Sequence, residues 1–174
     1  LVGSEMCIRD SWNGAPSVYA DYDKTKQTVL SLKSYIDAQP KSIQLCHIDA
    51  VPDNFLFVTG KDGSEEVKLT DWEYAGMQDP HLDVAMFIIY AMYDRDSAEK
   101  LIDLYFSDGC DKATRLKIYC YIAVSGLVWS NWCEFKRHCG VEFGAYAQRQ
   151  YDYAREYTKI FFKEYREAFG RDYV

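Results

Sequence analysis

The sequence predicts an α+β fold in which a small β-hairpin is followed by a bundle of helices. Two short apolar runs separated by a turn occupy residues 55–69, whereas apolar residues recur at three- and four-residue spacing over much of residues 82–169. The chain has 174 residues and is 48% hydrophobic, which suffices for one domain with a substantial core.

The first expected element is an amphipathic helix over residues 24–38. Apolar residues such as Leu32 and Ile36 fall on one face of this segment at helical spacing. Residues 1–22 show no such period. The sequence therefore predicts an unassigned N-terminal segment over residues 1–22 and one folded unit over residues 23–174.

Three short strands are expected next. Residues 43–46 form the first, and residues 55–58 and 66–69 form the two strands of the hairpin. The turn Gly60-Lys61-Asp62-Gly63 between them contains the residues that tight turns favour. The hairpin would bring the residues before and after it together, although they are distant in the sequence.

Helices are expected over the remainder of the chain. Their predicted bounds are residues 82–93, 97–106, 112–138 and 144–169. Gly140 and Gly170 follow the last two, as is common after the C-terminus of a helix. The first of these helices is apolar nearly all round, which indicates burial.

Charge and hydropathy narrow the classes of partner. A net charge of −7 argues against nucleic acid, because phosphate backbones select surfaces rich in Lys and Arg. The longest apolar run, over residues 118–133, is interrupted by polar residues and is short for a membrane span. No membrane-spanning segment is therefore expected.

The cysteines indicate a reducing, cytoplasmic compartment. The six cysteines are irregularly spaced, and no C-x-x-C pair occurs. A zinc site from Cys133, His138 and Cys139 would need a fourth ligand from elsewhere in the chain.

Polar residues lie in a recognisable pattern on both sides of the predicted hairpin. Cys46-His47-Ile48-Asp49-Ala50-Val51-Pro52-Asp53-Asn54 reads H-x-D-x-x-x-x-N, and Leu69-Thr70-Asp71-Trp72-Glu73-Tyr74 ends the returning strand. An Asp and an Asn five positions apart, with a second Asp after the next hairpin, are typical of phosphoryl transfer.

Each of these residues has a candidate role. Asp49 can accept a hydroxyl proton, although a loop Asp can also cap a turn. His47 is expected to hold the loop by hydrogen bonds. Asn54 and Asp71 offer the hard oxygen ligands that Mg²⁺ takes beside nucleotide phosphates. If its segment is extended, Glu73 points to the same side as Asp71 and could meet a metal-bound water or a cationic substrate; otherwise it is a surface Glu.

Two further features lie in the helical part. Trp129 and Trp132 are three residues apart on the predicted long helix, so they lie near one face and either wall a site for a quaternary ammonium or belong to the core. Asp83, at the start of the first of these helices, could pair with the loop that carries Asp49.

The two motifs resemble the choline/ethanolamine kinase family, particularly its bacterial choline kinase branch, within the aminoglycoside-phosphotransferase-like kinases. The match is continuous from Leu45 to Ala85, through H-I-D-A-V-P-D-N-F-L-F and L-T-D-W-E-Y-A-G-M-Q-D-P-H-L-D-V-A, and extends less closely over about residues 23–165. The resemblance implies the mostly helical C-terminal lobe of a protein-kinase-like fold, with the hairpin carrying the catalytic and metal loops.

The resemblance also implies roles for individual residues. The implied catalytic residues are Asp49 and His47, the implied ligands of Mg²⁺ and of the ATP phosphates are Asn54 and Asp71, and the implied substrate-binding residues are Glu73, Trp129 and Trp132. Tyr90 stands where eukaryotic members often carry an acidic residue of the choline pocket.

The activity that the resemblance implies is an ATP- and Mg²⁺-dependent kinase acting on the hydroxyl of choline or a related amino alcohol. Kinases of this group also have an N-terminal lobe with a Gly-rich loop and a strand lysine, and neither feature precedes residue 42. The chain is therefore expected to be a C-terminal lobe that is inactive alone. The alternatives are a kinase of ethanolamine, thiamine or an aminoglycoside, and an inactive fragment that only binds ligand.

Overall fold

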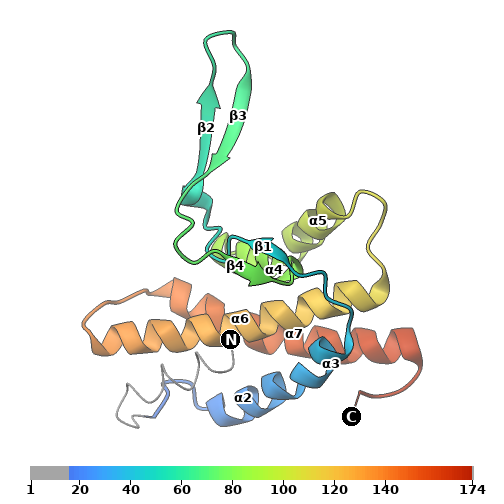
Figure 1. The fold of residues 1–174 in the computed structure, drawn as a ribbon. Coiled ribbons are helices and arrows are strands. Elements are labelled where there is room, and N and C mark those ends of the chain that lie inside the picture. Colours follow the sequence, from blue (N-terminus) through green and yellow to red (C-terminus); the bar gives the residue numbers. More distant parts are fainter. Residues whose placement is uncertain (1–15, 174) are drawn as a thin grey trace.

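The computed structural model describes residues 16–173, and its architecture is mostly helical with two small antiparallel sheets (Figure 1). The expected α+β arrangement is confirmed. The helices are α2 (Tyr22–Ser31), α3 (Lys33–Ala38), α4 (His81–Tyr90), α5 (Arg95–Tyr105), α6 (Lys112–His138) and α7 (Ala145–Phe169). The strands are β1 (Gln44–Cys46), β2 (Phe55–Thr59), β3 (Glu65–Leu69) and β4 (Gly76–Gln78), and a short 3₁₀ helix, η1, spans Pro52–Asn54.

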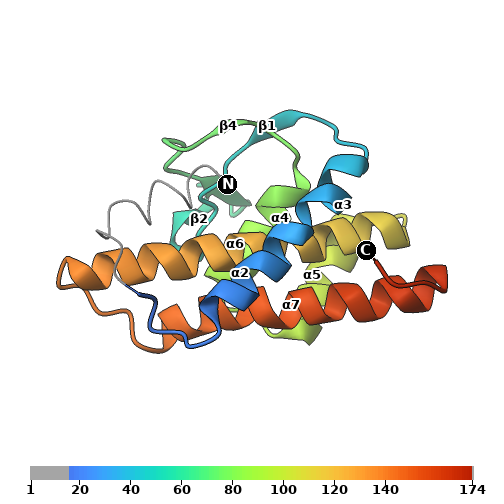
Figure 2. The ribbon, with the colours of Figure 1, turned by 90° about the horizontal axis from the view of Figure 1, so that it is seen from below.

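The long helices α6 and α7 run antiparallel and side by side, and α2 lies along them (Figures 1 and 2). Gly126 permits the close contact between α6 and α7. A Cβ atom at this position would lie 2.7 Å from the Gln150 carbonyl oxygen and 2.8 Å from the Tyr153 Cβ. Any side chain at Gly126 would therefore force the two helices apart.

The main hydrophobic core lies between α3, α4, α5, α6 and α7. Ile88 and Ile89 of α4, Ile122 of α6 and Phe161 of α7 are fully buried in it. The expectation that the helix beginning near residue 82 is buried is confirmed, since most of α4 is buried. Because most of α4 is buried, this helix is a rigid element of the fold.

The single helix expected over residues 24–38 is instead two helices, α2 and α3, that meet at Leu32. The Leu32 amide donates to the Val29 carbonyl, a tightened turn, and the Leu32 side chain is buried in the core. Ser31 and Ser34 donate their hydroxyls to carbonyls three residues earlier. Such bonds compete with the helical pattern and bend helices, which a count of apolar spacing does not register.

Residues 17–19, which the sequence left unassigned, are attached to the long helices. The Glu134 carboxylate accepts hydrogen bonds from the Ser17 hydroxyl and the Val18 amide, at 3.0 and 2.7 Å. The Tyr19 ring stacks on Tyr151 of α7, with ring centroids 3.8 Å apart. The packed part of the chain therefore begins before α2.

The predicted hairpin is confirmed, with β2 and β3 paired from Phe55–Leu69 to Thr59–Glu65. It projects from the body of the molecule (Figure 1). Apolar side chains on it are exposed, most of all Phe57, whose exposed fraction is 83%. The base of the hairpin, and not its tip, contributes to the site.

Strand β4 was not predicted. It pairs with β1 through Gln44–Gln78, Leu45–Met77 and Cys46–Gly76. Its three residues, Gly-Met-Gln, carry no alternating pattern, and only pairing with β1 reveals them as a strand. This pairing brings together the start of the loop at residues 47–54, before the hairpin, and the end of the loop at residues 70–75, after it.

Residues 16–173 contain neither a disulfide among the cysteines described nor a helix that could cross a membrane. The cysteines in this range, at positions 46, 110, 120, 133 and 139, are all free thiols. No group of three or more His, Cys, Asp or Glu side chains within the same range is arranged to hold a metal ion, so the zinc alternative is not found there. None of the helices in this part of the chain combines the length and the apolar character that a bilayer requires.

A buried ion pair links α6 to the start of α4. The Lys117 ammonium lies 2.7 Å from Asp79 Oδ2 and 2.8 Å from the Pro40 carbonyl oxygen, and the Lys117 and Asp79 residues are 2% and 4% exposed. Burial alone would raise the pKa of Asp79, but the hydrogen bonds from Lys117 and the His81 amide outweigh burial and lower it. The negative charge is therefore retained inside the protein.

Replacement of Lys117 by Met should lower the free energy of unfolding by about 3–5 kcal/mol, because it leaves a buried carboxylate without its counter-ion. Since the Asp79 pKa is depressed in the folded protein, the pair stabilises above about pH 4 and this contribution is lost as the pH falls. Urea denaturation at pH 7 and at pH 3 should show a smaller difference between wild type and variant at pH 3.

Lys33→Met is the matched control, because Lys33 makes an exposed i,i+4 ion pair with Asp37. This variant should unfold almost as the wild type does. Equal losses in both variants would show that burial of the Lys117–Asp79 pair has no special effect.

Candidate active site

The backbone of the predicted catalytic loop is held by Asp83, in the first turn of α4. The Asp83 carboxylate accepts from the His47 amide and from the Ile48 amide, each at 2.8 Å. Ile48 has a φ angle of 70°, a left-handed conformation that is costly for a β-branched residue. The two charge-assisted hydrogen bonds offset this cost, so the expected pairing of Asp83 with the loop is confirmed.

His47 connects the loop before the hairpin to the loop after it. Its ring Nε2 lies 2.8 Å from the Thr70 carbonyl oxygen, and because a carbonyl can only accept, Nε2 carries the hydrogen. The ring also meets Trp72 edge-on, with centroids 4.7 Å apart. His47 is 2% exposed, so its contacts match the expected structural role.

Asn54 and Asp71 lie at the same end of the hairpin. The Asn54 side-chain amide donates to the Asp49 carbonyl at 3.0 Å, and the Thr70 amide donates to the Asn54 carbonyl at 3.0 Å. The Asn54 side-chain oxygen is therefore left to serve as a ligand. Asp71 follows Thr70 directly; it is exposed and has a left-handed backbone conformation, with a φ angle of 63°. A neutral oxygen beside a carboxylate fits Mg²⁺, which commonly takes one or two carboxylates together with substrate phosphates.

Glu73 was expected to point to the same side as Asp71 only if the segment between them is extended. The segment after Asp71 is not extended, because the Ala75 amide donates to the Trp72 carbonyl and places Glu73 within a turn. Glu73 is exposed, and its neighbouring Tyr74, in contrast, lines the adjacent cavity. The Glu73 carboxylate raises the pKa of the Tyr74 hydroxyl.

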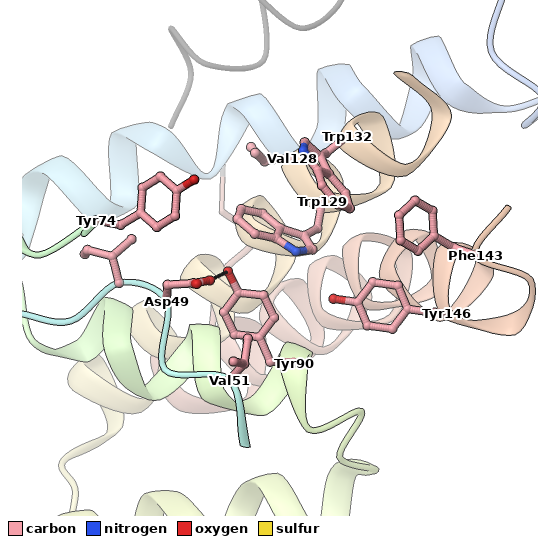
Figure 3. A pocket seen from close by; sticks show the side chains of 10 residues that line it. Asp49, Val51, Tyr74, Tyr90, Val128, Trp129, Trp132, Phe143 and Tyr146 are labelled. Atoms are coloured by element: carbon pink, nitrogen blue, oxygen red, sulfur yellow. Dashed lines mark hydrogen bonds between the residues drawn. The ribbon is translucent and has the colours of Figure 1, made fainter. Parts of the chain in front are cut away.

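A cavity of about 720 Å³ opens beside Asp49 (Figure 3). Most of its wall is aromatic. The aromatic side chains are Tyr74, Tyr90, Trp129, Trp132, Phe143 and Tyr146. Asp49 is the only carboxylate among its lining residues in the described part of the chain. The cavity therefore combines an apolar, π-rich wall with one negative charge.

The structure brings Trp129 and Trp132 into the wall of this cavity, and both project from α6 (Figure 3). Their ring centroids are 6.3 Å apart with planes inclined by 23°, and Phe143 extends the wall at 5.1 Å from Trp132. Both indoles are partly buried, and Trp129 also packs against the main hydrophobic core, so this wall of the cavity is supported by the core.

Tyr90 lies between Asp49 and Trp129, and its contact with Asp49 was not predicted from the sequence. The Tyr90 hydroxyl donates to Asp49 Oδ1 at 2.6 Å, and its ring meets Trp129 edge-on with centroids 5.2 Å apart. Burial, and then the hydrogen bond to Asp49, raise the pKa of Tyr90, so the hydroxyl stays protonated.

Sequence reasoning also missed Phe143 and Tyr146 as wall residues. They come from the segment between α6 and α7 and from the first turn of α7. The available signal for Tyr90 was its position seven residues after Asp83, which places both on one side of α4.

Comparison with known families agrees with this geometry. Residues 8–108, more than half of the chain, match the family described as choline/ethanolamine kinase. The chain belongs to the choline/ethanolamine kinase family. The mostly helical arrangement is that of the C-terminal lobe of the kinase-like fold in this family, as the sequence predicted.

Relatives of this family support the assignment. The protein LicA of Haemophilus influenzae is 30% identical over 121 residues, which cover 63% of this chain and 41% of that protein. The crystal structure of choline kinase LicA from Streptococcus pneumoniae is 26% identical, with a TM-score of 0.67, over 90% of this chain and 55% of that one. A further structure is of LicA in complex with AMP, at 26% identity and a TM-score of 0.69.

A more distant structure shows the same fold. The choline/ethanolamine kinase family protein from Mesorhizobium loti has a TM-score of 0.76 at 23% identity, over 91% of this chain and 54% of that one. The chain therefore spans about half the length of these solved relatives and less than half of the curated LicA protein.

Replacement of Asp83 by Asn should lower the free energy of unfolding by about 2 kcal/mol or more, because an amide keeps one acceptor and turns its NH₂ group towards a backbone N–H. Urea denaturation measures this effect. Asp94→Asn is the control, since Asp94 caps α5 by accepting from the Ser97 amide and Asn caps equally well. If Asp83→Asn were as stable as Asp94→Asn, the loop would not depend on the Asp83 carboxylate.

Proposed function

We propose that this chain forms the acceptor side of a kinase that transfers the γ-phosphoryl group of ATP to the hydroxyl of choline. The observation that carries the proposal is the aromatic cavity in which Asp49 is the lining carboxylate. The aromatic side chains of this cavity can bind a cation, and the Asp49 carboxylate can accept a proton from a hydroxyl group. The family assignment and the similarity to LicA choline kinase support the same function.

The wall suits a quaternary ammonium group. Such a cation has no N–H to donate, so it loses no hydrogen bonds on entering an apolar site, and it is attracted to the faces of indole and phenol rings by about 0.5–2 kcal/mol per contact. Trp129 and Trp132 present two indole rings inclined by only 23°, with Phe143 beside them. We assign these residues to the trimethylammonium group.

Asp49 is assigned as the general base. As the hydroxyl oxygen of choline forms a bond to the γ-phosphorus, the bond from that phosphorus to the β–γ bridging oxygen breaks and ADP leaves. The hydroxyl proton passes to the Asp49 carboxylate. Much of the rate enhancement then comes from positioning the two reactants and excluding water.

His47 acts in this proposal by holding the catalytic loop through its contacts with Thr70 and Trp72. We assign the transferred proton to Asp49 and not to His47, because Nε2 already donates to the Thr70 carbonyl and the His47 ring, including Nδ1, is buried.

Asn54 and Asp71 are assigned to the Mg²⁺ that accompanies ATP and, through it, to the ATP phosphates. When bound, the cation offsets the negative charge on the phosphates. The chain contributes the two oxygen donors and their common position at the end of the hairpin, through Thr70. Glu73 is assigned to the exposed edge of this region, because its side chain is exposed and it is not among the residues that line the aromatic cavity.

This chain spans about half the length of its solved relatives, so the proposed activity is that of a longer protein. We infer that residues 23–174 supply the acceptor and metal residues as the C-terminal lobe, that an N-terminal lobe supplies the rest of the nucleotide site, and that the enzyme works in the cytoplasm. The assays below therefore use the full-length protein.

The alternatives differ in the acceptor or in activity itself. Ethanolamine, thiamine and aminoglycosides carry N–H donors or larger rings, which an aromatic wall satisfies less well than it satisfies a trimethylammonium group. A panel of these acceptors with labelled ATP separates them. Ligand binding without turnover in the full-length protein would favour the inactive alternative.

Asp49→Asn in the full-length protein should lower kcat for phosphocholine formation by about 10²–10⁴-fold, because it removes the base while keeping the shape of the side chain. The assay is the release of labelled phosphocholine at saturating choline and ATP. Asp53→Asn, an exposed position in the same loop, is the control and should leave kcat near the wild-type value. Normal turnover by Asp49→Asn would contradict the assignment.

Trp129→Ala should raise the KM for choline by about tenfold while the KM for ATP changes by less than about twofold, since the indole contacts the ammonium group and not the nucleotide. Both constants are measured in the same variant, so the ATP value serves as the internal control. Equal increases in both would show a general distortion and would remove the case for an ammonium wall.

A further inference from the structure

We propose that Tyr90 is a positioning residue for the general base: its hydroxyl holds one oxygen of the Asp49 carboxylate so that the other faces the acceptor, and its ring joins the base to Trp129. This inference rests on the proposed function and concerns a residue for which the sequence comparison suggested only a departure from eukaryotic members. Tyr90 thus links the charged and the aromatic parts of the site (Figure 3).

The contacts around Asp49 hold one of its two carboxylate oxygens. Its Oδ1 accepts from the Tyr90 hydroxyl at 2.6 Å, and its backbone carbonyl accepts from the Asn54 side chain and the Val51 amide. Within residues 16–173 no hydrogen bond engages Asp49 Oδ2. The Tyr90 hydroxyl therefore holds one oxygen of a cavity-lining carboxylate and leaves the second oxygen available to an acceptor hydroxyl.

Tyr90 is supported by the buried helix α4. The residue is 9% exposed and lies in α4, seven residues after Asp83. Asp83 therefore accepts from the loop backbone and Tyr90 donates to the loop side chain from the same side of one buried helix. The base is positioned from a rigid element and does not depend on the loop alone.

Tyr90 contacts both the proposed base and the proposed ammonium wall. The Tyr90 ring meets Trp129 edge-on at 5.2 Å, while its hydroxyl contacts Asp49 at 2.6 Å. The same side chain therefore sets the position of the base relative to the ammonium wall. An acceptor is used well only when its hydroxyl and its cationic group are separated by the length that this arrangement provides.

The test compares Tyr90→Phe with wild type in the full-length protein, with choline and with its three-carbon homologue, trimethyl(3-hydroxypropyl)ammonium. The variant keeps the ring against Trp129 and loses only the hydroxyl. We expect kcat for choline to fall by about ten- to a hundredfold, with the KM for choline within about threefold of wild type. The preference for choline over the longer homologue, as a ratio of kcat/KM, should also fall by about threefold or more.

Tyr35→Phe is the matched control, because it removes another part-buried hydroxyl, which donates to the Ala113 carbonyl far from the cavity. It should leave kcat and the preference between the two acceptors unchanged. In an Asp49→Asn background, Tyr90→Phe should have no further effect on residual turnover, since Tyr90 acts through the carboxylate.

The outcomes separate this inference from the proposed function. Wild-type turnover of choline with an unchanged kcat in Tyr90→Phe would overturn the role of Tyr90 and leave the function standing. Failure of the wild type to phosphorylate choline would overturn the function and, with it, the role of Tyr90 in that reaction. A double-mutant cycle of Tyr90→Phe with Asp49→Ala in urea unfolding should still show coupling, because Ala removes the acceptor oxygen, and zero coupling would overturn the contact itself.

Discussion

The arrangement of the site depends on the hydrogen bonds between the Asp83 carboxylate and the backbone of the loop that carries Asp49. The carboxylate accepts hydrogen bonds from two consecutive amides, those of His47 and Ile48. These bonds stabilise the left-handed backbone conformation of Ile48, which is unfavourable for a β-branched residue. Asp49 follows at once, and its direction is set by that conformation. Because Asp83 projects from the buried helix α4, the position of the loop is set by the hydrophobic core.

The loop separates two environments with different chemistry. On one side, the hairpin and the β1–β4 pair bring Asn54 and Asp71 to an exposed edge suited to a hydrated cation and phosphates. On the other side, aromatic residues of α4, α6 and α7 enclose a cavity suited to an organic cation. Asp49 lies between the two, which is where a hydroxyl would be deprotonated as it meets a phosphoryl group.

Local patterns in the sequence predicted the hairpin, the long helices and the loop motif, because each depends on residues near one another in the chain. Patterns could not predict β4, whose three residues are a strand only through β1. The break at Leu32 depends on serine hydroxyls bonding back to the helix, and the contact of Tyr90 with Asp49 depends on how α4 meets the loop. The roles of Asp49, Asn54, Asp71 and the two tryptophans stay predictions.

The most direct test of the account is a crystal structure of the full-length protein with choline and a non-hydrolysable Mg²⁺–ATP analogue. The account predicts the choline nitrogen within about 6 Å of the Trp129 ring centroid. It also predicts the choline hydroxyl within hydrogen-bond reach of Asp49 Oδ2, with the Tyr90 hydroxyl still on Oδ1. Choline bound outside the aromatic cavity, or with its hydroxyl turned away from Asp49, would contradict it.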